Sequence, residues 1–487
     1  MTLVGIISPA FPEILLGIGS LLLLVLGLLI NSEKRITDYA LLLLIGVGCA
    51  LFFQSETGVF FQGMFQNSYF TWFYKISIVV TIFFVLWSSS PTHDRYDLNF
   101  FEYPIIILFG GIGLLLMVSA QNFLLLYLGL EIVSLSSCVL CGARKGSYQA
   151  SEAALKYFIL SALASGMYLY GVSLVYGVVG STQYSVIQNA FLESFPIGGV
   201  IGVAFILISF AFKASLAPFH MWAPDVYQGA PTPVTSFISV GPKMASVAIL
   251  LIVLTGPFLF IKKYFMEIIY VMAVLSMGIG AFATIYQTRI KRLLAYSSIG
   301  HVGFAGVALV VDNPEAYQAA ILYMLIYGLN TVGIFACLIS LKQNKQENVG
   351  SEDIEIKNFS GLAQVRPKHA FCLMIMLFSL AGIPPLLGFF GKLVVIKAAV
   401  NVGFYTLSIV AVLSSVVSSF YYLNVIKVMY FDAPTGILES KGGIISLRSK
   451  ITMGLFAGIM ILGAALPFVT EAILESSQKA GYSLVVH

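Results

Sequence analysis

Three lysines within long apolar runs are the residues of this sequence that point most directly to chemistry. Lys213 lies in ISFAFKASLAPFH, Lys243 in ISVGPKMASVAIL and Lys392 in LLGFFGKLVVI. Placing a lysine at the centre of a bilayer costs about 3 kcal/mol on insertion scales, so such residues usually face a polar interior and mark an ion path. The sequence therefore predicts an ion-translocating membrane protein, most simply a proton carrier. A purely structural role for these lysines is the alternative.

Proline and glycine are concentrated beside two of these lysines. A helix that is broken at membrane depth frees backbone groups and is one way to build an ion site. We therefore expect the spans that carry Lys213 and Lys392 to be interrupted. The residues expected to break them are Pro218, Pro224, Gly382, Pro384, Pro385 and Gly388.

Four other titratable residues are candidates for the same path. Glu131, in LLLYLGLEIVSLSS, is either a proton site or a structural partner of a lysine. Lys156, in SEAALKYFIL, is the cation expected near it, or a side chain that snorkels to the interface. The imidazoles of His301, in YSSIGHVGF, and His220 titrate near neutrality, so either relays protons or is a hydrogen-bonded core residue.

The composition places the chain in the membrane-protein class. It is 59% hydrophobic and 10% charged, with a mean hydropathy of +0.95. Apolar runs long enough to span a bilayer occur about fourteen times. The predicted fold is thus an all-α polytopic membrane protein with two broken helices. The net charge of +4 is spread over short loops, which does not suggest a nucleic-acid-binding surface.

Basic residues follow the odd-numbered spans and are nearly absent after the even-numbered ones. That alternation is the positive-inside pattern for an even number of spans. We expect both termini on the outer, proton-receiving side and the long polar segment 342–369 on the inner side.

Motifs for nucleotides, redox groups and metals are missing from the sequence. There is no Walker loop, no G-x-G-x-x-G before a helix and no clustered set of Cys or His ligands. Cys138 and Cys141 form an isolated C-x-x-C, so we predict no metal site. We expect the chain to bind no cofactor and to take energy from an ion gradient or from a partner.

The segments with the lysines also carry a family resemblance. FKASLAPFHMWAPDVYQGAPTPVTSF, TRIKRLLAYSSIGHVGFAGVAL and LAGIPPLLGFFGK resemble the antiporter-like membrane subunits of respiratory complex I. Within that family, WAPDVYQGAPTPV and LGLEIVSL are similar to the branch called subunit 2 or subunit N. The resemblance extends from about residue 100 to 430, across the spans that hold every candidate residue.

The resemblance implies two inverted five-helix repeats. On it we divide the chain into three N-terminal helices (1–100), a first repeat (101–260), a second, inverted repeat (261–432) and a C-terminal helix with its tail (433–487). It implies that Glu131 and Lys156 form a charged pair. It also implies that Lys213 and Lys243 form the input side of a proton relay, which His301 links to Lys392.

The implied activity is proton translocation coupled to NADH:ubiquinone oxidoreduction by other subunits. NADH, FMN, iron–sulfur clusters and ubiquinone are then expected on partner subunits. The chain itself is expected to contact other membrane-arm subunits of complex I and membrane lipid. The motifs favour a mitochondrial inner membrane, with a bacterial plasma membrane as the alternative. The competing functions are an Mrp-type cation/proton antiporter subunit and a structural subunit whose charges only pair.

Overall fold

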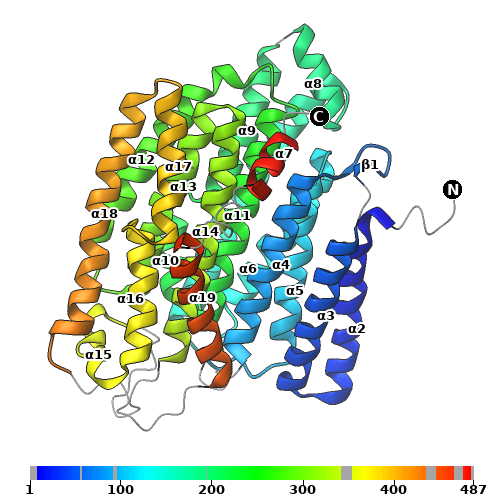
Figure 1. Ribbon diagram of the computed structural model, residues 1–487. Helices are drawn as coiled ribbons and strands as arrows, with labels where there is room; N and C mark the ends of the chain where they lie inside the picture. The colour runs from blue at the N-terminus through cyan, green and yellow to red at the C-terminus, as the bar shows by residue number, and fades with distance from the viewer. Residues whose placement is uncertain are drawn as a thin grey trace.

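The protein is a bundle of long helices that run between two ends of the molecule (Figure 1). The computed structural model describes residues 8–54, 57–90, 96–194, 196–341, 354–434, 446–465 and 475–483. Strands are confined to one short hairpin among these residues, β1 (Gly58–Phe60) paired antiparallel with β2 (Phe65–Asn67).

The N-terminal part and the first expected repeat contain ten α-helices. Their bounds are α2 Phe11–Ile30, α3 Glu33–Phe53, α4 Tyr69–Ser89, α5 Glu102–Ser119, α6 Phe123–Cys141, α7 Tyr148–Val179, α8 Tyr184–Glu193, α9 Ile197–Ala214, α10 Trp222–Gly229 and α11 Thr232–Thr255.

The rest of the described chain continues the bundle. Its helices are α12 Met266–Ile285, α13 Ile290–Val311, α14 Pro314–Ser340, the short α15 Leu362–Val365, α16 Pro367–Ala381, α17 Leu387–Asn401, α18 Tyr405–Phe431 and α19 Leu447–Ala465. Short 3-10 turns are η1 Ser8–Ala10, η3 Lys262–Tyr264 and η4 Ile356–Phe359.

The helices confirm the all-α polytopic membrane fold. Among the described residues, 12 helices are long and apolar enough to cross a membrane. The pair α16–α17 and helix α19 cover the two remaining expected spans. Segment 342–353, the first part of the polar loop 342–369 expected on the inner side, lies outside the described residues.

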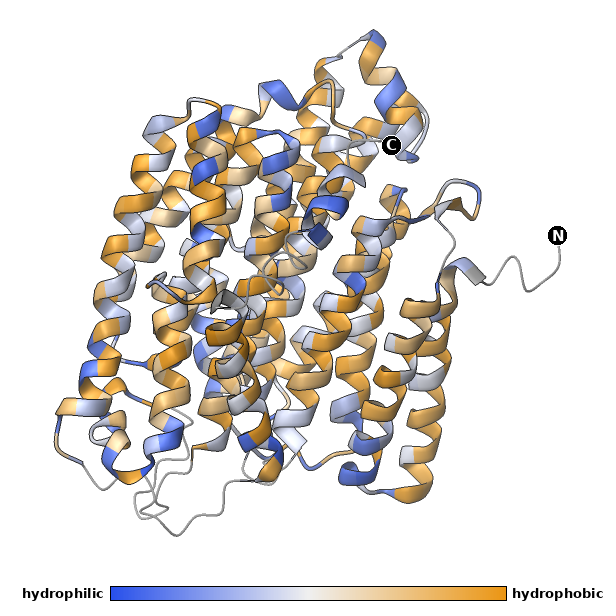
Figure 2. Cartoon of the chain, in the orientation of Figure 1, coloured by the Kyte–Doolittle hydropathy of each residue, from blue (hydrophilic) through white to orange (hydrophobic). Residues whose placement is uncertain are grey.

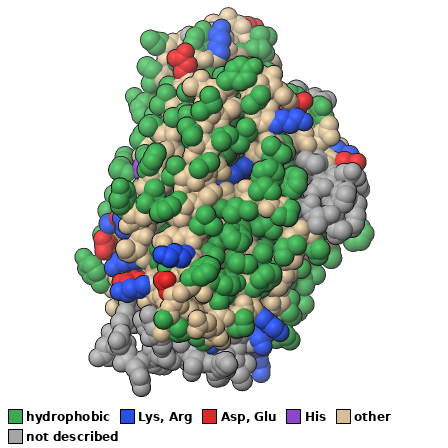
Figure 3. All heavy atoms as spheres, turned by 60° about the vertical axis from the view of Figure 1, so that its left-hand side comes forward, with side chains coloured by type: hydrophobic (Ala, Val, Ile, Leu, Met, Phe, Trp, Pro, Cys, Tyr) green, Lys and Arg blue, Asp and Glu red, His purple; other side chains and the backbone are tan. Residues whose placement is uncertain are grey.

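The surface of the bundle suits a hydrocarbon solvent. Hydrophobic residues run along the helices, and hydrophilic residues gather mainly near their ends (Figure 2). Broad areas of hydrophobic side chains cover the face shown in Figure 3. Leu163, Ile409 and Val416 are each more than half exposed on long helices. Apolar areas of this breadth are typical of a surface that contacts lipid or another protein.

Three helices form the centre of the bundle. The apolar windows of α11, α13 and α14 are 100%, 94% and 89% buried. The helices therefore contact protein on nearly all sides, and polar groups on them must find protein partners. Lys243 and His301 lie on two of these helices.

The two broken helices are confirmed. α9 ends at Ala214 and α10 begins at Trp222, whereas α16 ends at Ala381 and α17 begins at Leu387. Pro218 lies in the first break, and Gly382, Pro384 and Pro385 lie in the second.

Two residues expected to break a helix lie just beyond the breaks. Pro224 is the third residue of α10, where a proline is tolerated because first-turn N–H groups have no helical acceptor. Gly388 is the second residue of α17. A Cβ atom there would lie 1.9 Å from the carbonyl oxygen of Ser379. Its missing side chain thus allows α17 to pack closely on the end of α16.

Candidate functional site

The first buried lysine is held by hydroxyl groups from two neighbouring helices. Lys213 is in the last turn of α9 and is only 7% exposed. Its Nζ donates to Ser134 Oγ on α6 at 2.5 Å and to Ser161 Oγ on α7 at 2.6 Å. Serine hydroxyls stay uncharged at neutral pH. Their hydrogen bonds therefore satisfy the ammonium group but do not determine whether the lysine is charged or neutral.

The backbone around Lys213 is stabilised where the helix stops. Ser215 adopts the left-handed conformation (φ 64°) that ends many helices. The Leu216 N–H then bonds back to the Ala211 carbonyl at 2.8 Å. Trp222 Nε1 donates to the Phe212 carbonyl at 2.9 Å, and the Ala217 N–H donates to Ser276 Oγ on α12 at 2.8 Å. The break is thus a defined structure with satisfied backbone groups.

Glu131 is the carboxylate that acts electrostatically on Lys213. It lies on α6, and its Oε1 accepts a hydrogen bond from Ser165 Oγ on α7. A carboxylate near a buried ammonium favours the protonated lysine, and its loss favours the neutral amine. The structure therefore brings together Glu131 and Lys213.

The charged pair Glu131–Lys156 that the resemblance implies is not formed. Lys156 Nζ instead contacts Glu152 Oε1 at 2.8 Å and Asp225 Oδ2 at 2.7 Å. Ser165, the partner of Glu131, is nine residues further along α7, which is roughly 13 Å of helix. Lys156 thus lies toward the helix end, with a side chain 41% exposed.

Asp225 joins the two halves of the chain. It lies in the first turn of α10 and also contacts Arg292 Nη1 of α13 at 2.9 Å. Burial would raise the pKa of Asp225, but the hydrogen bonds and positive charges of Lys156 and Arg292 outweigh it. The pKa of the carboxyl therefore lies below its ordinary value.

The second lysine of the path lies on the fully buried helix α11. Lys243 is 0% exposed, and its Nζ donates to Ser298 Oγ on α13. It also lies 5.3 Å from the ring centroid of Tyr227 on α10. His220, in the first break, interacts electrostatically with Lys243, and its Nδ1 has no hydrogen-bond partner among the described residues. His220 thus connects the first break electrostatically with Lys243.

His301 lies one turn beyond Ser298 on α13 and is hydrogen-bonded on both sides of its ring. Nδ1 is 2.6 Å from the hydroxyl of Tyr323 on α14, and Nε2 is 3.1 Å from the hydroxyl of Tyr422 on α18. Tyr422 is in turn bonded to Ser297. A neutral imidazole with a hydroxyl at each nitrogen can accept a proton on one side and release one on the other.

Lys392 lies in the second turn of α17, directly after the second break. Its Nζ donates to the Ala381 carbonyl at 2.9 Å and to Ser415 Oγ of α18 at 2.9 Å. Ala381 is the last residue of α16, so the lysine satisfies a carbonyl that the break leaves without a helical donor. Lys392 also lies 5.4 Å from the ring centroid of Phe304.

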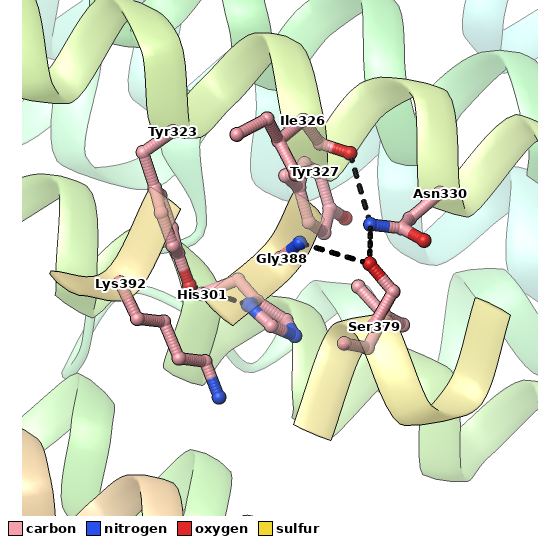
Figure 4. A pocket seen from close by; sticks show the side chains of 9 residues that line it. His301, Tyr323, Ile326, Tyr327, Asn330, Ser379, Gly388 and Lys392 are labelled. Atoms are coloured by element: carbon pink, nitrogen blue, oxygen red, sulfur yellow. Dashed lines mark hydrogen bonds between the residues drawn. The ribbon is translucent and has the colours of Figure 1, made fainter. Parts of the chain in front are cut away.

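A small cavity connects His301 with Lys392. Both side chains line it, together with Tyr323, Tyr327 and Asn330 (Figure 4). Its volume of about 10 Å³ is close to the minimum for one water molecule. Asn330 Oδ1 is buried without a hydrogen-bond partner among the described residues, which supplies an acceptor for such a water.

The structure therefore places the predicted residues in two groups. Lys213 and Glu131 lie at the first break, and Lys243, His301 and Lys392 follow through the centre toward the second. Both Lys243 and Lys392 act electrostatically on His301. Lys156 is separate, in the ion pairs with Asp225.

Sequence reasoning missed the uncharged partners and one buried ion pair. Ser134, Ser161, Ser298 and Ser415 come from four different helices, and no local pattern distinguishes them from other serines. Glu13 of α2 and the fully buried Lys75 of α4 form an ion pair of 2.7 Å. A lysine in the first half of an apolar span was the available signal for that pair.

Comparison with known proteins gives one consistent family. Residues 120–418 match the model described as NADH:quinone oxidoreductase/Mrp antiporter, TM. NADH-quinone oxidoreductase subunit N of Paramagnetospirillum magneticum is 41% identical over 477 residues, which cover 95% of this chain and 96% of the relative. Subunit N 1 of Rhizobium meliloti is 41% identical over 97% of this chain and 98% of the relative.

Solved structures agree with the sequence relatives. A chain of respiratory complex I from Thermus thermophilus superposes with a TM-score of 0.81 at 27% identity, covering 96% of this chain and 99% of that chain. A chain of the Mrp complex from Dietzia has the same TM-score at 20% identity, covering 100% and 98%. The latter likeness is one of fold alone.

Proposed function

Because the chain belongs to the family of NADH:quinone oxidoreductase and Mrp antiporter membrane subunits, we propose that it is a proton-translocating membrane-arm subunit of a bacterial-type NADH-quinone oxidoreductase. The relatives named above are subunits N of NADH-quinone oxidoreductases, and their similarity covers nearly the whole chain. The observation that carries the proposal is the row of buried titratable groups between the two broken helices.

The row has the properties that proton transfer requires. Each lysine amine contacts at least one hydroxyl. A buried ammonium releases its proton more readily than an exposed one, because the charged form is poorly solvated. Glu131 counteracts this at Lys213. A change in the separation of Glu131 and Lys213 therefore switches the lysine between a charged and a neutral form.

The remaining steps follow the order in which the buried groups lie between the two breaks. The proton passes from Lys213 toward Lys243, past His220, and on from Lys243 through the Ser298 hydroxyl toward His301. His301 accepts it at one nitrogen while the other releases one through a tyrosine hydroxyl. Lys392 receives it across the small cavity. The chain contributes the relay, and the redox chemistry and its NADH, FMN, iron–sulfur and ubiquinone groups belong to partner subunits.

The surroundings of the chain are part of the same proposal. The bacterial relatives favour a plasma membrane, whereas the mitochondrial inner membrane that the motifs favour stays a prediction. Both termini face the outer side, and neighbouring membrane-arm subunits and lipid cover the bundle. Cysteine labelling of segment 342–369 in oriented vesicles tests the topology, since labelling from the outer side contradicts it.

Proton uptake by vesicles that contain the assembled complex tests the relay. We expect Lys213→Ala and Lys243→Ala to impair uptake strongly and Lys156→Ala to impair it less. The first two lysines are buried, whereas Lys156 is 41% exposed and lies in a surface ion pair. Assembly must be matched by the amount of complex in the membrane. Wild-type uptake in all three variants would instead support a purely structural role.

An Mrp-type cation/proton antiporter subunit is the second candidate, because the matching family model includes Mrp antiporters and the fold is shared. Purification from native membranes separates the two. Companions that oxidise NADH and reduce quinone support the first function. Sodium-dependent exchange with no such companions supports the second.

A further inference from the structure

A groove on the apolar surface of the bundle runs between α9 and α12 and ends at the first broken helix. Its volume is about 530 Å³, within the range of small-molecule binding sites. The residues that form its walls and floor include Leu207, Ile208, Pro218, Phe219, Met272 and Leu275.

The groove is open to the outside of the chain along α12. Ile268, Val271 and Leu275 lie at successive turns of that helix, line the groove, and are 53%, 52% and 42% exposed. A groove with apolar walls in this position is not filled by water, because an apolar cavity does not supply the two to four polar partners that a buried water needs. Hydrocarbon from the membrane is the matching content.

Two residues of opposite charge lie at or just before the start of α12, the helix that forms one wall of the groove. Glu267, the second residue of α12, is the one ionisable residue that lines the groove. Lys263, four residues earlier, lies 5.1 Å from the ring centroid of Tyr264. Neither forms an ion pair with a described residue, whereas the adjacent Lys262 is paired with Asp312 at 2.8 Å. An exposed cation and an exposed carboxylate therefore stand unpaired beside an apolar groove.

We propose that this groove binds one acyl chain of a zwitterionic phospholipid with a free ammonium headgroup. The phosphate lies at Lys263 and the ammonium at Glu267, and the acyl chain extends along α12 to Pro218 and Phe219. Phosphatidylethanolamine has this headgroup. Phosphatidylcholine carries the same charges, but its ammonium is fully methylated and cannot donate a hydrogen bond to the carboxylate.

The bound chain contacts the break that follows Lys213. Phe219 lies three residues before Trp222, the first residue of α10, and within the same short segment as Pro218. An occupied groove therefore supports the broken helix from the lipid side. That consequence for transport rests on the proposed function, whereas the binding itself does not.

Photo-crosslinking in the assembled complex tests the occupant. A photoreactive amino acid replaces Val271 at the rim of the groove, and the complex is purified in mild detergent with phosphatidylethanolamine and phosphatidylcholine of identical acyl chains. We expect a phospholipid adduct on this chain, predominantly with phosphatidylethanolamine. An adduct with a neighbouring subunit, or no lipid adduct, would overturn the proposal.

Two substitutions separate the acyl-chain and headgroup contacts. Leu275→Trp fills the groove, so the retained phospholipid should be lost, whereas Ile409→Trp on the exposed face of α18 should leave it unchanged. Glu267→Gln should retain the lipid but lose the preference for phosphatidylethanolamine, with Glu193→Gln as the matched control. Equal retention in Leu275→Trp and wild type contradicts the site.

Proton uptake by the same variants is a separate measurement. A Leu275→Trp complex that loses the lipid and pumps more slowly supports the link to the broken helix. If the complex loses the lipid but pumps normally, the binding site is supported and the proposed effect of the lipid on transport is excluded. Failure of the proposed function itself is distinguishable, because it leaves the lipid adduct intact.

Discussion

The two broken helices hold their lysines on opposite sides of the break. Lys213 lies in the last turn before the first break, and Lys392 lies in the second turn after the second break. Lys213 turns to hydroxyls on neighbouring helices, whereas Lys392 binds the Ala381 carbonyl that its own break exposes. One break therefore presents its lysine to other helices, and the other break supplies a ligand for its lysine.

The two sites also differ in charge. Glu131 acts electrostatically on Lys213, but no carboxylate among the described residues acts so on Lys392. In the proposed repeats, α6 and α13 are the second helices of each unit. The helix that carries a carboxylate in the first unit thus carries the imidazole of His301 in the second. The first lysine has an opposite charge to stabilise its ammonium form, and the second has a neutral proton carrier beside it.

The largest expected effect is the loss of either lysine. Lys213→Met and Lys392→Met each remove a titratable amine from the row, so each should reduce proton uptake to near background at normal assembly. Lys427→Met, at an exposed position of α18, is the control and should pump normally. If only one of the two variants is defective, the two breaks do not belong to one path.

The carboxylate should distinguish the two sites. Glu131→Gln removes the charge and keeps the shape, so the proton affinity of Lys213 should fall. One pKa unit corresponds to about 1.4 kcal/mol, and we expect uptake to fall about tenfold. Glu131→Asp should retain part of the activity. Measuring uptake and assembly together is decisive, because normal pumping by the Gln variant with failed assembly of the Asp variant would make Glu131 structural.

A smaller effect is expected from the serines that support the breaks. Ser379 Oγ accepts hydrogen bonds from the Gly388 N–H and from Asn330 Nδ2, both at 3.0 Å. Ser276 Oγ accepts one, from the Ala217 N–H. Leaving a buried donor unsatisfied costs about 1–3 kcal/mol. Ser379→Ala should therefore increase hydrogen–deuterium exchange at the second break, and Ser276→Ala should increase it less at the first break. A larger increase in Ser276→Ala would contradict this prediction.

The smallest expected effect concerns the residue that ends each first half-helix. Both positions are left-handed, but the first is Ser215 (φ 64°) and the second is Gly382 (φ 84°). Ser215→Gly should relieve strain of roughly 1 kcal/mol. Gly382→Ala should add a similar strain and place a Cβ atom 2.9 Å from Lys392 Cδ. The midpoint temperature of thermal inactivation should therefore rise in Ser215→Gly and fall in Gly382→Ala. A shift in the same direction in both variants would show that other contacts determine the stability of the breaks.

Much of the fold could be predicted because the relevant signals are local. A run of apolar residues has to span the bilayer wherever it occurs, and a cluster such as Gly382, Pro384 and Pro385 cannot continue a helix. Even so, Pro224 and Gly388 fell just inside the next helices. Their backbone groups are compatible with a first turn, and only the backbone path decides where that turn begins.

The sequence by itself determined the class of protein, the broken helices and the lysines that must avoid lipid. The tertiary structure alone decided which groups those lysines contact. Lys156 was assigned to Glu131 and instead binds Asp225, which lies 69 residues away on another helix. Ser134, Ser161, Ser298 and Ser415 became ligands for the same reason. Hydropathy acts on each segment separately, whereas a buried ammonium is satisfied by whichever oxygen the packing of several helices brings within about 3 Å.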